Sequence, residues 1–266
     1  MRRSCCAVLV LLTAGLAAFA CAQETAKAPP SAKIWIDRKA DFEERLKTAE
    51  VVKVKDIGQG VTNPKKVTLQ YDGRTFHAVF KPIEPGRQRG FWESYEAEVA
   101  AYELDKLLGL DMVPPTIERK VDKHFGSLQL WVYDCKLYKE VQDKTPRTMA
   151  WSNQISRMKI FDNLVDNRDR NAGNFMVDEA WKIVLIDHSR AFMTRKGLAK
   201  KPAQQPVRYD RRLMEKLEAL DKETLDSRMK GLLMQGQINS LLKRRDALLE
   251  HRDKLIEKRG ESDVLF

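Results

Sequence analysis

Strand-like runs of residues occupy the chain between residues 51 and 134. The first three runs are 51–57, 66–71 and 75–82. A Gly-containing loop separates the first two, and the tight Asp72-Gly73 turn between the last two predicts a hairpin. The segments "MVPPTIERK" and "GSLQLWVYD", punctuated by Pro and Gly, are interpreted as two further strands. We therefore expect a small antiparallel sheet in this part of the chain.

One helical pattern interrupts these strands at "GFWESYEAEVAAYELDKLLGL", residues 90–110. Its apolar positions recur at helical spacing, and Gly109 is a natural C-terminal end. After residue 134 helices predominate. Thr145 is the expected cap of one helix, with Pro146 just inside it. The segment "QINSLLKRRDALLEHRDKLIEKRG" predicts another helix, with an apolar stripe opposed by basic residues. Such a helix can lie on a membrane, but closure of a helical lobe is the interpretation that we favour.

A short hairpin is expected within the helical part, with strands near residues 174–177 and 181–186. The order of elements predicts an α+β fold of two lobes. Residues 34–133 would form a small antiparallel-sheet lobe with one helix, and residues 134–266 a larger helical lobe that carries the hairpin. A chain of 266 residues is long enough to bury a full hydrophobic core.

The first 22 residues follow the pattern of a secretory signal peptide. Two arginines precede a short apolar run, and small residues at alternate positions from Ala18 to Ala22 suit cleavage. The apolar run is too short for a membrane span. Cys21 offers a lipid anchor as the alternative, because "AFAC" is a poor version of a bacterial lipobox, and plain cleavage is favoured. We therefore expect an exported protein in which residues 23–33 form a polar linker.

Charge and cysteine content narrow the range of partners. The formal net charge is +10, and the signal segment contributes only Arg2 and Arg3, so the remainder carries about +8. This excess suits an acidic ligand such as a phosphate compound, an anionic lipid head or an acidic peptide, although soluble basic proteins share it equally. No recognised nucleic-acid-binding module accompanies the charge. Only Cys135 clearly remains after cleavage, so internal disulfides are not expected.

Candidate chemistry gathers in residues 165–192, "VDNRDRNAGNFMVDEAWKIVLIDHSRAF". Asp169 and Asn174 stand five residues apart in a polar loop, and Asp187 ends the apolar run "KIVLI". Phosphoryl transfer needs a carboxylate that orients the incoming hydroxyl and oxygen ligands that hold metal ions. Asp169 suits the first role. Asn174 and Asp187 suit the second, because Mg²⁺ accepts one Asn and one Asp together with phosphate oxygens. The hairpin between them would bring both ligands to one ion.

Lys81 supplies the cation that such a site requires. It ends the apolar segment "HAVFKP", where an inward-pointing lysine suits the phosphates of a nucleotide. A carboxylate from the helix that follows would hold this lysine, and we select Glu98 with Glu96 as the second candidate. Gly58 and Gly60 in "DIGQGVTNP" would place backbone N–H groups over the phosphates. The first lobe therefore predicts a nucleotide-binding surface.

Taken in order, these motifs resemble the atypical kinases with a protein-kinase-like fold. "VFKP", "EVAAYELDKLLGLDMVPP", "NRDRNAGN" and "IDHSRAF" are similar to the type II phosphatidylinositol 4-kinases, the secretory-pathway (Golgi casein kinase) family and the HipA-like kinases. Asn167-Arg168-Asp169 falls where ordinary protein kinases have His-Arg-Asp, and Asp187-His188-Ser189 falls where they have Asp-Phe-Gly. The resemblance covers roughly residues 50–195. It implies ATP with Mg²⁺ or Mn²⁺, and transfer of the γ-phosphoryl group to a hydroxyl.

Two other activities fit the same residues. The alternative is an exported pseudokinase that binds nucleotide or acts as a scaffold without turnover. Ser189 in place of the usual Gly and the sparse glycine loop fit it, whereas the retained Asp169, Asn174 and Lys81 favour turnover. Transfer of a nucleotidyl group from an inverted ATP would use similar residues. The motifs leave the hydroxyl acceptor open between a protein, a lipid head group and a sugar or other small molecule. We expect a monomer without a nucleic-acid partner, for which peripheral or lipid-anchored membrane contact is an option.

Overall fold

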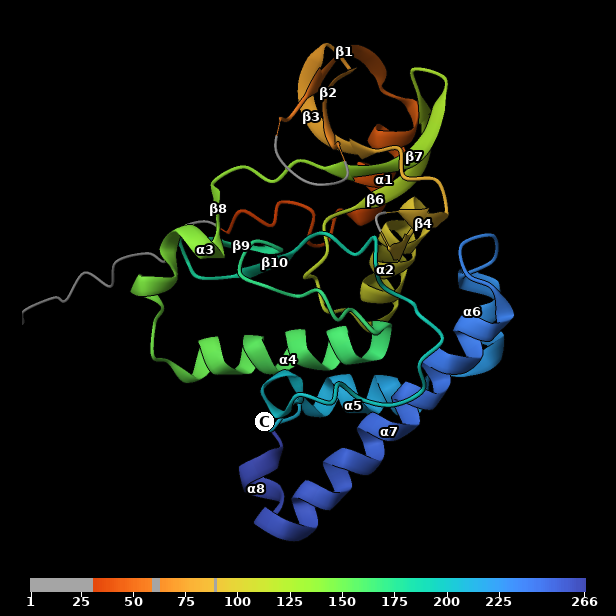
Figure 1. Ribbon diagram of the computed structural model, residues 1–266. Coiled ribbons are helices and arrows are strands. Elements are labelled where there is room, and N and C mark those ends of the chain that lie inside the picture. The colour runs from red at the N-terminus through yellow and green to blue at the C-terminus, as the bar shows by residue number, and fades with distance from the viewer. Residues whose placement is uncertain (1–30, 59–62, 89) are drawn as a thin grey trace, which may run out of the picture.

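The computed structural model describes residues 31–58, 63–88 and 90–266 and has the two-lobed arrangement expected from the sequence (Figure 1). An antiparallel sheet forms one lobe, and helices α4, α5 and α7 form most of the other. The predicted signal peptide, Cys21 and Gly60 lie outside the described residues. Within the described ranges, no helix has the length and apolar character needed to cross a membrane.

The sheet lobe is built on five antiparallel strands in the order β1-β2-β3-β7-β6. Their bounds are β1 Glu50–Asp56, β2 Lys65–Tyr71, β3 Arg74–Lys81, β6 Thr116–Val121 and β7 His124–Leu130. Each strand overlaps one of the five predicted runs. Asp72 and Gly73, at the β2–β3 turn, have φ of 47° and 68°, and this left-handed conformation suits a two-residue hairpin loop. The predicted hairpin is therefore present.

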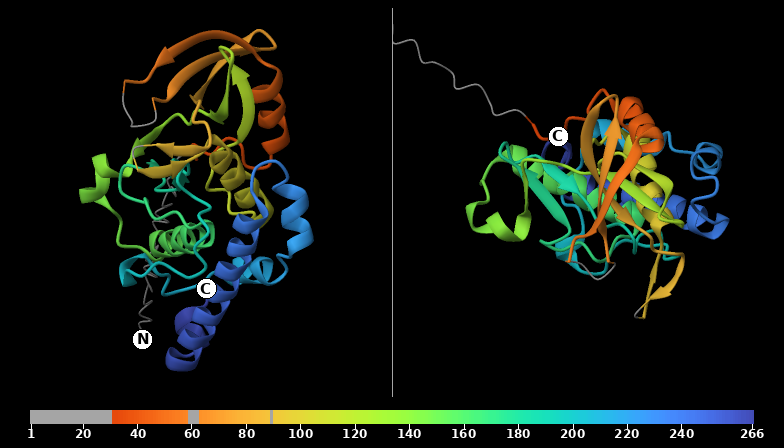
Figure 2. Two further views of the ribbon diagram at one scale, coloured as in Figure 1. Left: turned by 45° about the vertical axis from the view of Figure 1, so that its right-hand side comes forward. Right: turned by 90° about the horizontal axis from the view of Figure 1, so that it is seen from above.

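Helix α2 (Tyr95–Leu108) matches the helix predicted after the third strand. The hydroxyl of Ser94 accepts a hydrogen bond from the backbone N–H of Glu96, which caps the helix start. Gly109, with φ of 62°, ends the helix as predicted. A small hairpin precedes the helix and projects from the body of the molecule (Figure 2). Its strands are β4 Gly86–Gln88 and β5 Phe91–Glu93.

A second helix, α1 (Lys39–Thr48), also accompanies the sheet, whereas the sequence suggested one helix in this lobe. Most of its residues are charged or polar. Its two buried residues, Phe42 and Leu46, are four positions apart and pack in the same cluster as the sheet. Such a short apolar stripe gives little periodic signal, which explains why the pattern did not reveal this helix.

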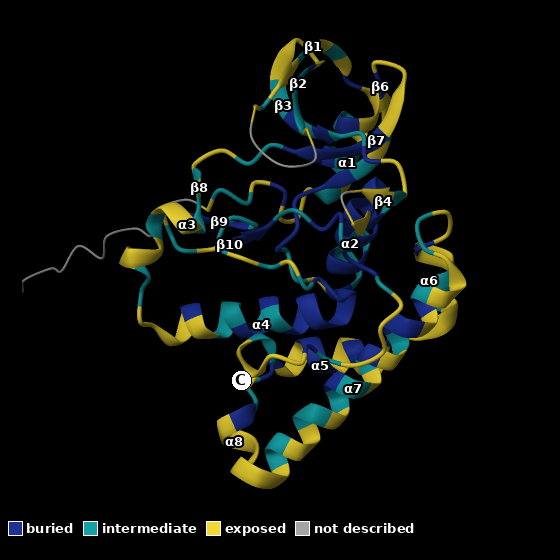
Figure 3. Ribbon diagram, in the orientation of Figure 1, coloured by how far each residue is buried: buried dark blue, intermediate teal, exposed yellow. Residues whose placement is uncertain are grey.

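The helical lobe is organised around α4 (Met149–Val165), which is exposed at its start and buried along its second half (Figure 3). Its cap is Thr148, whose side chain accepts from the backbone N–H of Trp151. The expected cap at Thr145 is wrong, and Pro146 lies outside the helix, because Thr148 makes the capping bond. The other helical elements are α3 Tyr138–Val141, η1 Gln142–Lys144, η2 Pro202–Gln204, α5 Arg211–Glu218, α6 Lys222–Arg228, α7 Gln235–Arg259 and α8 Glu261–Val264.

The predicted hairpin of the helical lobe lies between the two lobes. It consists of β9 (Phe175–Asp178) and β10 (Ile183–Leu185), and β8 (Cys135–Leu137) completes a three-stranded antiparallel sheet in the order β10-β9-β8. The strand β8 follows directly on the last strand of the sheet lobe. The connection between the lobes is therefore tied to the hairpin that carries the candidate metal ligands.

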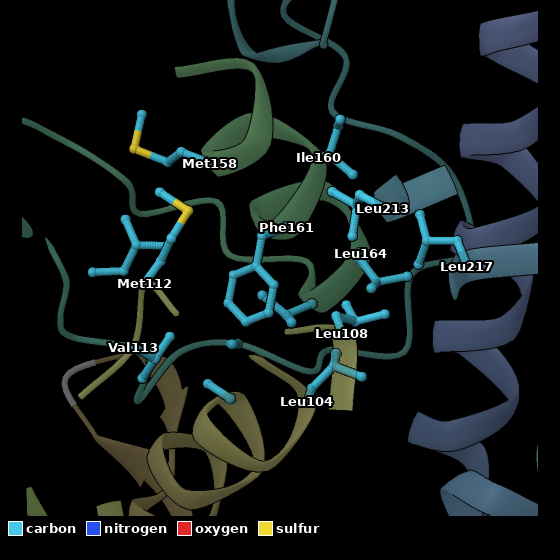
Figure 4. Close-up of a cluster of buried hydrophobic side chains, with 14 of the residues drawn as sticks. Leu104, Leu108, Met112, Val113, Met158, Ile160, Phe161, Leu164, Leu213 and Leu217 are labelled. Atoms are coloured by element: carbon cyan, nitrogen blue, oxygen red, sulfur yellow. The ribbon is translucent and has the colours of Figure 1, made fainter. Parts of the chain in front are cut away.

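Buried apolar side chains form two clusters. The sheet cluster consists of Trp35, Phe42, Leu46, Ala49, Val67, Leu69, Ala78, Phe80, Val121, Leu128, Leu130 and Val184. The helical cluster includes residues from α2, α4, α5 and α7, and Figure 4 shows Leu104, Leu108, Phe161, Leu164, Leu213 and Leu217 packed together. Helix α2 precedes two strands of the sheet in sequence, yet its apolar face belongs to the helical cluster.

Helix α7 closes the helical lobe, as its amphipathic pattern suggested. Its apolar residues are buried in the helical cluster. It also contributes Arg244, which is fully buried and donates hydrogen bonds to backbone carbonyls. Arg244 Nε lies 2.8 Å from the carbonyl oxygen of Leu164, and Nη1 contacts the carbonyl oxygens of Met193, at 2.9 Å, and of Arg195. This arginine fixes the end of α4 and the segment after Asp187 to α7.

Candidate active site

The amine of Lys81 lies between two carboxylates that come from distant parts of the chain. Lys81 Nζ is 2.5 Å from Glu98 Oε1 and 3.0 Å from Asp187 Oδ1. Lys81 is the last residue of strand β3, and Glu98 lies on helix α2. Asp187 follows the end of β10 by two residues. Glu98, rather than Glu96, therefore contacts the lysine. The backbone N–H of Glu96 instead donates to Ser94 Oγ at the helix cap, and its carboxylate accepts from the same hydroxyl at 3.4 Å.

Burial and charge act in opposite directions on Lys81. Burial alone would lower the pKa of the amine, but the charges of Asp187 and Glu98 and their hydrogen bonds raise it above its usual value. The charge of Lys81 in turn lowers the pKa of Asp187, against the effect of burial. Lys81 is therefore a permanent cation and Asp187 a permanent anion at neutral pH.

The two ends of the β9–β10 hairpin meet at one place. The backbone N–H of Ile186 donates to the carbonyl oxygen of Asn174 at 3.4 Å, which brings Asp187 next to Asn174. The side-chain amide of Asn174 donates through Nδ2 to the carbonyl oxygen of Asp169 at 2.9 Å. This bond orients the amide, so that its oxygen is the group able to hold a cation. Asp187 adopts a left-handed φ of 63°, which an Asp tolerates better than most residues.

Asp169 lies at the surface of the same site, with 46% of its side chain exposed. Its backbone N–H donates to Asn167 Oδ1 at 3.2 Å, and its carboxylate oxygen Oδ2 accepts from Arg190 Nη1 at 3.0 Å. The carboxylate is thus held in place while one side of it remains open to a second reactant.

A buried polar network underlies these residues, and the sequence reasoning missed it. Arg170 donates from Nε and Nη2 to the carboxylate of Asp162 and from Nη1 to the carbonyl oxygens of Asn174 and Ile186. Its Nη2 also lies 2.9 Å from His188 Nε2. Arg170 therefore fixes both ends of the hairpin. The available sequence signal was Asp162, an acid among the apolar residues Ile160, Phe161, Leu164 and Val165 of the predicted helix.

His188 is a fully buried neighbour of these residues. Burial, followed by the nearby charges of Arg170 and Lys81, lowers the pKa of His188 well below its ordinary value, so the ring is neutral. Because Arg170 donates to Nε2, the proton of the neutral ring resides on Nδ1. This atom faces Glu98 Oε2 at 3.9 Å, and neither atom has a hydrogen-bond partner within the described part of the chain.

A cavity of about 1030 Å³ opens between the lobes beside these side chains. Lys81, Asp169, Asn174 and Asp187 all line it, together with the connection between the lobes at residues 129–135. Its volume is at the upper end of the range for small-molecule sites. Ile57 and Pro64 line it on either side of the predicted glycine loop. Gly58, with φ of 68°, does not appear among the lining residues of the described segments.

The donor set fits a divalent cation that is shared with phosphates. Within residues 31–58, 63–88 and 90–266, no cluster of three or more His, Cys, Asp or Glu side chains is placed to hold a metal. A metal held here would have the carboxylate of Asp187 and the amide oxygen of Asn174 as protein ligands. Mg²⁺ commonly takes so few protein ligands when a nucleotide provides the others.

Comparisons with known proteins agree with this arrangement. Residues 52–249 match the family model described as phosphatidylinositol 3- and 4-kinase. Protein Rv2133c of Mycobacterium tuberculosis is 24% identical over 151 residues, 43% of this chain and 54% of that protein, so the match spans about half of the relative's length.

Two solved structures share the fold. A hydra Fam20 structure with sugar has a TM-score of 0.65 at 14% identity and covers 85% of this chain and 91% of that one. The Golgi casein kinase with Mn/ADP bound has a TM-score of 0.65 at 17% identity and covers 85% of this chain and 78% of that one. At such identities the likeness establishes the protein-kinase-like fold. Together with the family match over most of the sequence, it shows that this chain belongs to the phosphatidylinositol 3- and 4-kinase family of phosphotransferases.

Proposed function

We propose that the chain is an ATP-dependent kinase that moves the γ-phosphoryl group to a hydroxyl of a protein, lipid or small-molecule acceptor with Mg²⁺ or Mn²⁺. The observation that carries this proposal is the position of Lys81. Its amine joins Glu98 and Asp187 at the wall of a nucleotide-sized cavity that Asp169 and Asn174 also line. The charged amine of Lys81 can bind the phosphates of a nucleotide, and the ionised carboxylate of Asp187 can bind the metal ion that accompanies them.

Each side chain has a separate role in this proposal. Lys81 binds the nucleotide phosphates, and Glu98 holds Lys81 in position. Asp169 orients the acceptor hydroxyl and takes up its proton, for which its exposed carboxylate is suited. Asn174 and Asp187 hold the metal, which neutralises charge on the phosphates when it is bound.

We propose that residues 1–22 direct export of the chain, with plain cleavage favoured over a lipid anchor at Cys21. The relation to the Golgi casein kinase structure supports a secretory role. We also propose that the chain acts as a monomer, because its own two lobes supply every residue assigned to the site.

The test is phosphate transfer from labelled ATP, with Mg²⁺ or Mn²⁺, to panels of lipids, peptides and sugars. We expect Lys81→Met and Asp187→Ala to lower turnover by about 10²-fold or more, because each removes a charge that stabilises the transferring group. Lys106→Met is the matched control, since Lys106 also bridges two carboxylates, Glu43 of α1 and Glu103 of α2, each at 2.8 Å, and lines neither cavity.

Two results would overturn the proposal in favour of the alternatives. Thermal stabilisation by nucleotide without phosphate transfer to any panel would identify a pseudokinase. Acceptors that gain AMP instead of phosphate, as seen by mass spectrometry, would identify a nucleotidyltransferase.

A further inference from the structure

A second cavity, of about 460 Å³, lies next to Asp169. The β4–β5 hairpin, the segment 192–195 and the start of α7 line it. Only Asp169 and Arg190 line both cavities among the described residues. The two cavities therefore meet at this pair. A donor in the larger cavity and an acceptor in the smaller one would react at the junction.

Arg190 is held at this junction from three directions. Its Nη1 lies 3.0 Å from Asp169 Oδ2, and its Nε lies 2.6 Å from Glu93 Oε1. The guanidinium also stacks over the ring of Phe91, 4.3 Å from the ring centre. Both Glu93 and Phe91 belong to strand β5. The hairpin thus places the cation, and the side chain keeps 23% of its surface exposed.

The other basic residues near the junction are not placed to contact groups in both cavities. Lys81 is held by Glu98 and Asp187, with 12% of its side chain exposed. Arg170 is buried against Asp162, and its remaining donors bind backbone carbonyls and His188. Lys139, the other basic residue that lines the larger cavity, does not line the smaller one. Arg87, Arg168 and Arg195 line the smaller cavity but not the larger one. Within the part of the chain that the structure describes, Arg190 is therefore the one basic residue that lines both cavities.

We propose that Arg190 is a catalytic residue that binds the phosphoryl group during its transfer. This inference rests on the proposed kinase function. The acceptor oxygen forms a bond to the γ-phosphorus, while the bond from that phosphorus to the β–γ bridging oxygen breaks and its electron pair leaves with ADP. The acceptor proton passes to the carboxylate of Asp169. The guanidinium of Arg190 faces the negative charge on the oxygens of the moving group, the role of an arginine finger supplied by the same chain.

The experiment compares the purified chain with its Arg190→Gln and Arg190→Lys variants. Water replaces the unidentified acceptor, so that hydrolysis of γ-labelled ATP with Mg²⁺ or Mn²⁺ measures turnover. Binding of ADP is measured with and without aluminium fluoride, which mimics the transferring phosphoryl group. We expect Arg190→Gln to lower turnover by about 10²-fold or more. It should abolish the extra affinity due to fluoride and leave binding of ADP alone unchanged within about twofold. Arg190→Lys should recover part of both losses, since it restores the charge without the planar fork.

Arg252→Gln is the matched control. Arg252 likewise bridges two carboxylates, Glu218 at 2.6 Å and Asp253 at 2.8 Å, but on α7 far from the cavities. The turnover of the Arg252→Gln variant should equal that of the unmodified chain.

The outcomes separate two kinds of failure. Turnover and fluoride response that are the same in Arg190→Gln as in the unmodified chain would overturn the role of Arg190 and leave the kinase proposal standing. Equal loss of ADP affinity and turnover would show that Arg190 only holds the hairpin, and would also overturn it. An unmodified chain that binds ADP but shows neither turnover nor fluoride response would overturn the kinase proposal itself, and with it the catalytic arginine.

Discussion

The sheet cluster and the helical cluster meet at the β9–β10 hairpin. Val184 belongs to the sheet cluster, whereas its neighbours Ile183 and Leu185 belong to the helical cluster. Successive side chains of a strand face opposite sides, so a strand that is buried on both sides must be apolar throughout. This requirement explains why the run "IVLI" ahead of Asp187 contains no polar residue.

The two sides contribute unequally to the site. The sheet side contributes one charged residue, Lys81. Helix α2 counts with the helical side here, because its apolar face packs in the helical cluster. On this count the helical side contributes Glu98 and Asp187, the two carboxylates that bind Lys81, together with Asp169 and Asn174. The contacts of Lys81 therefore form a polar link between two regions with separate cores. The comparison teaches that most of the residues with a proposed chemical role come from the helical side. The sheet side supplies Lys81 and the strand residues that line the larger cavity.

The largest effect on the helical side should come from Arg170→Met. This change leaves the carboxylate of Asp162 buried without its partner, and we expect the free energy of unfolding to fall by about 3–5 kcal/mol. Urea or guanidinium unfolding measures the loss. Lys222→Met, which removes an exposed pair with Asp226, is the control and should cost less than about 1 kcal/mol. A comparably small loss for Arg170→Met would contradict a structural role for this network.

A pair of cavity-forming substitutions tests whether the two clusters are independent. Leu46 in α1 and Leu104 in α2 are both fully buried, one in each cluster. Leu46→Ala and Leu104→Ala should each lower the free energy of unfolding by about 2–5 kcal/mol. If the clusters are separate, the double variant should equal the sum of the two losses to within about 0.5 kcal/mol. Coupling above about 1 kcal/mol in the same unfolding assay would argue for a single shared core.

The smallest expected effect is a pH dependence of the free energy of unfolding, which arises from Asp105 on helix α2. Burial raises the pKa of Asp105 to about 7, although hydrogen bonds from the backbone of Met112 and Val113 and the charges of Lys33 and Lys39 oppose the shift. A carboxyl whose pKa is higher in the folded chain stabilises the fold at low pH, and this contribution is lost as pH rises through about 7.

We therefore expect the free energy of unfolding to fall by roughly 1–3 kcal/mol between pH 5 and pH 8 on account of Asp105. Asp105→Asn keeps an oxygen that can accept both backbone hydrogen bonds and cannot ionise, so it should remove this part of the pH dependence. Parallel pH profiles of the two proteins would show that Asp105 does not titrate in this range.

Sequence patterns predicted the fold best where a local rule decided the structure. The Asp72-Gly73 turn, the glycine at the end of α2 and the alternating strands each depend on a few neighbouring residues. Helix α1 was missed because two buried residues in ten give no clear period. The start of α4 was misplaced by three residues, because Thr145 and Thr148 are both suitable caps. Thr148 accepts the capping hydrogen bond, whereas the hydroxyl of Thr145 donates to the carbonyl oxygen of Gln142.

The site shows the same division between local motifs and tertiary contacts. Lys81, Asp169, Asn174 and Asp187 stand in recognisable motifs, and the structure brings all four to one cavity. The choice of Glu98 over Glu96 depends on which side of α2 faces the cavity, and the structure favours the first selection. Arg170 and Arg190 stand inside the motifs "NRDRNAGN" and "IDHSRAF". Their partners Asp162 and Glu93 lie outside these motifs, so the motifs did not predict these contacts.

The contacts of Arg244 bear on how the segment after Asp187 tolerates substitution. Arg244 donates hydrogen bonds to the backbone carbonyl oxygens of Met193 and Arg195. Replacing either of these two side chains would therefore leave the hydrogen bonds in place. Insertion or deletion of a single residue in this segment would instead move those carbonyl oxygens away from the buried guanidinium of Arg244, which would then lose its hydrogen-bond acceptors. The contacts of Arg244 therefore constrain the length of this segment, and they do not depend on which side chains it carries.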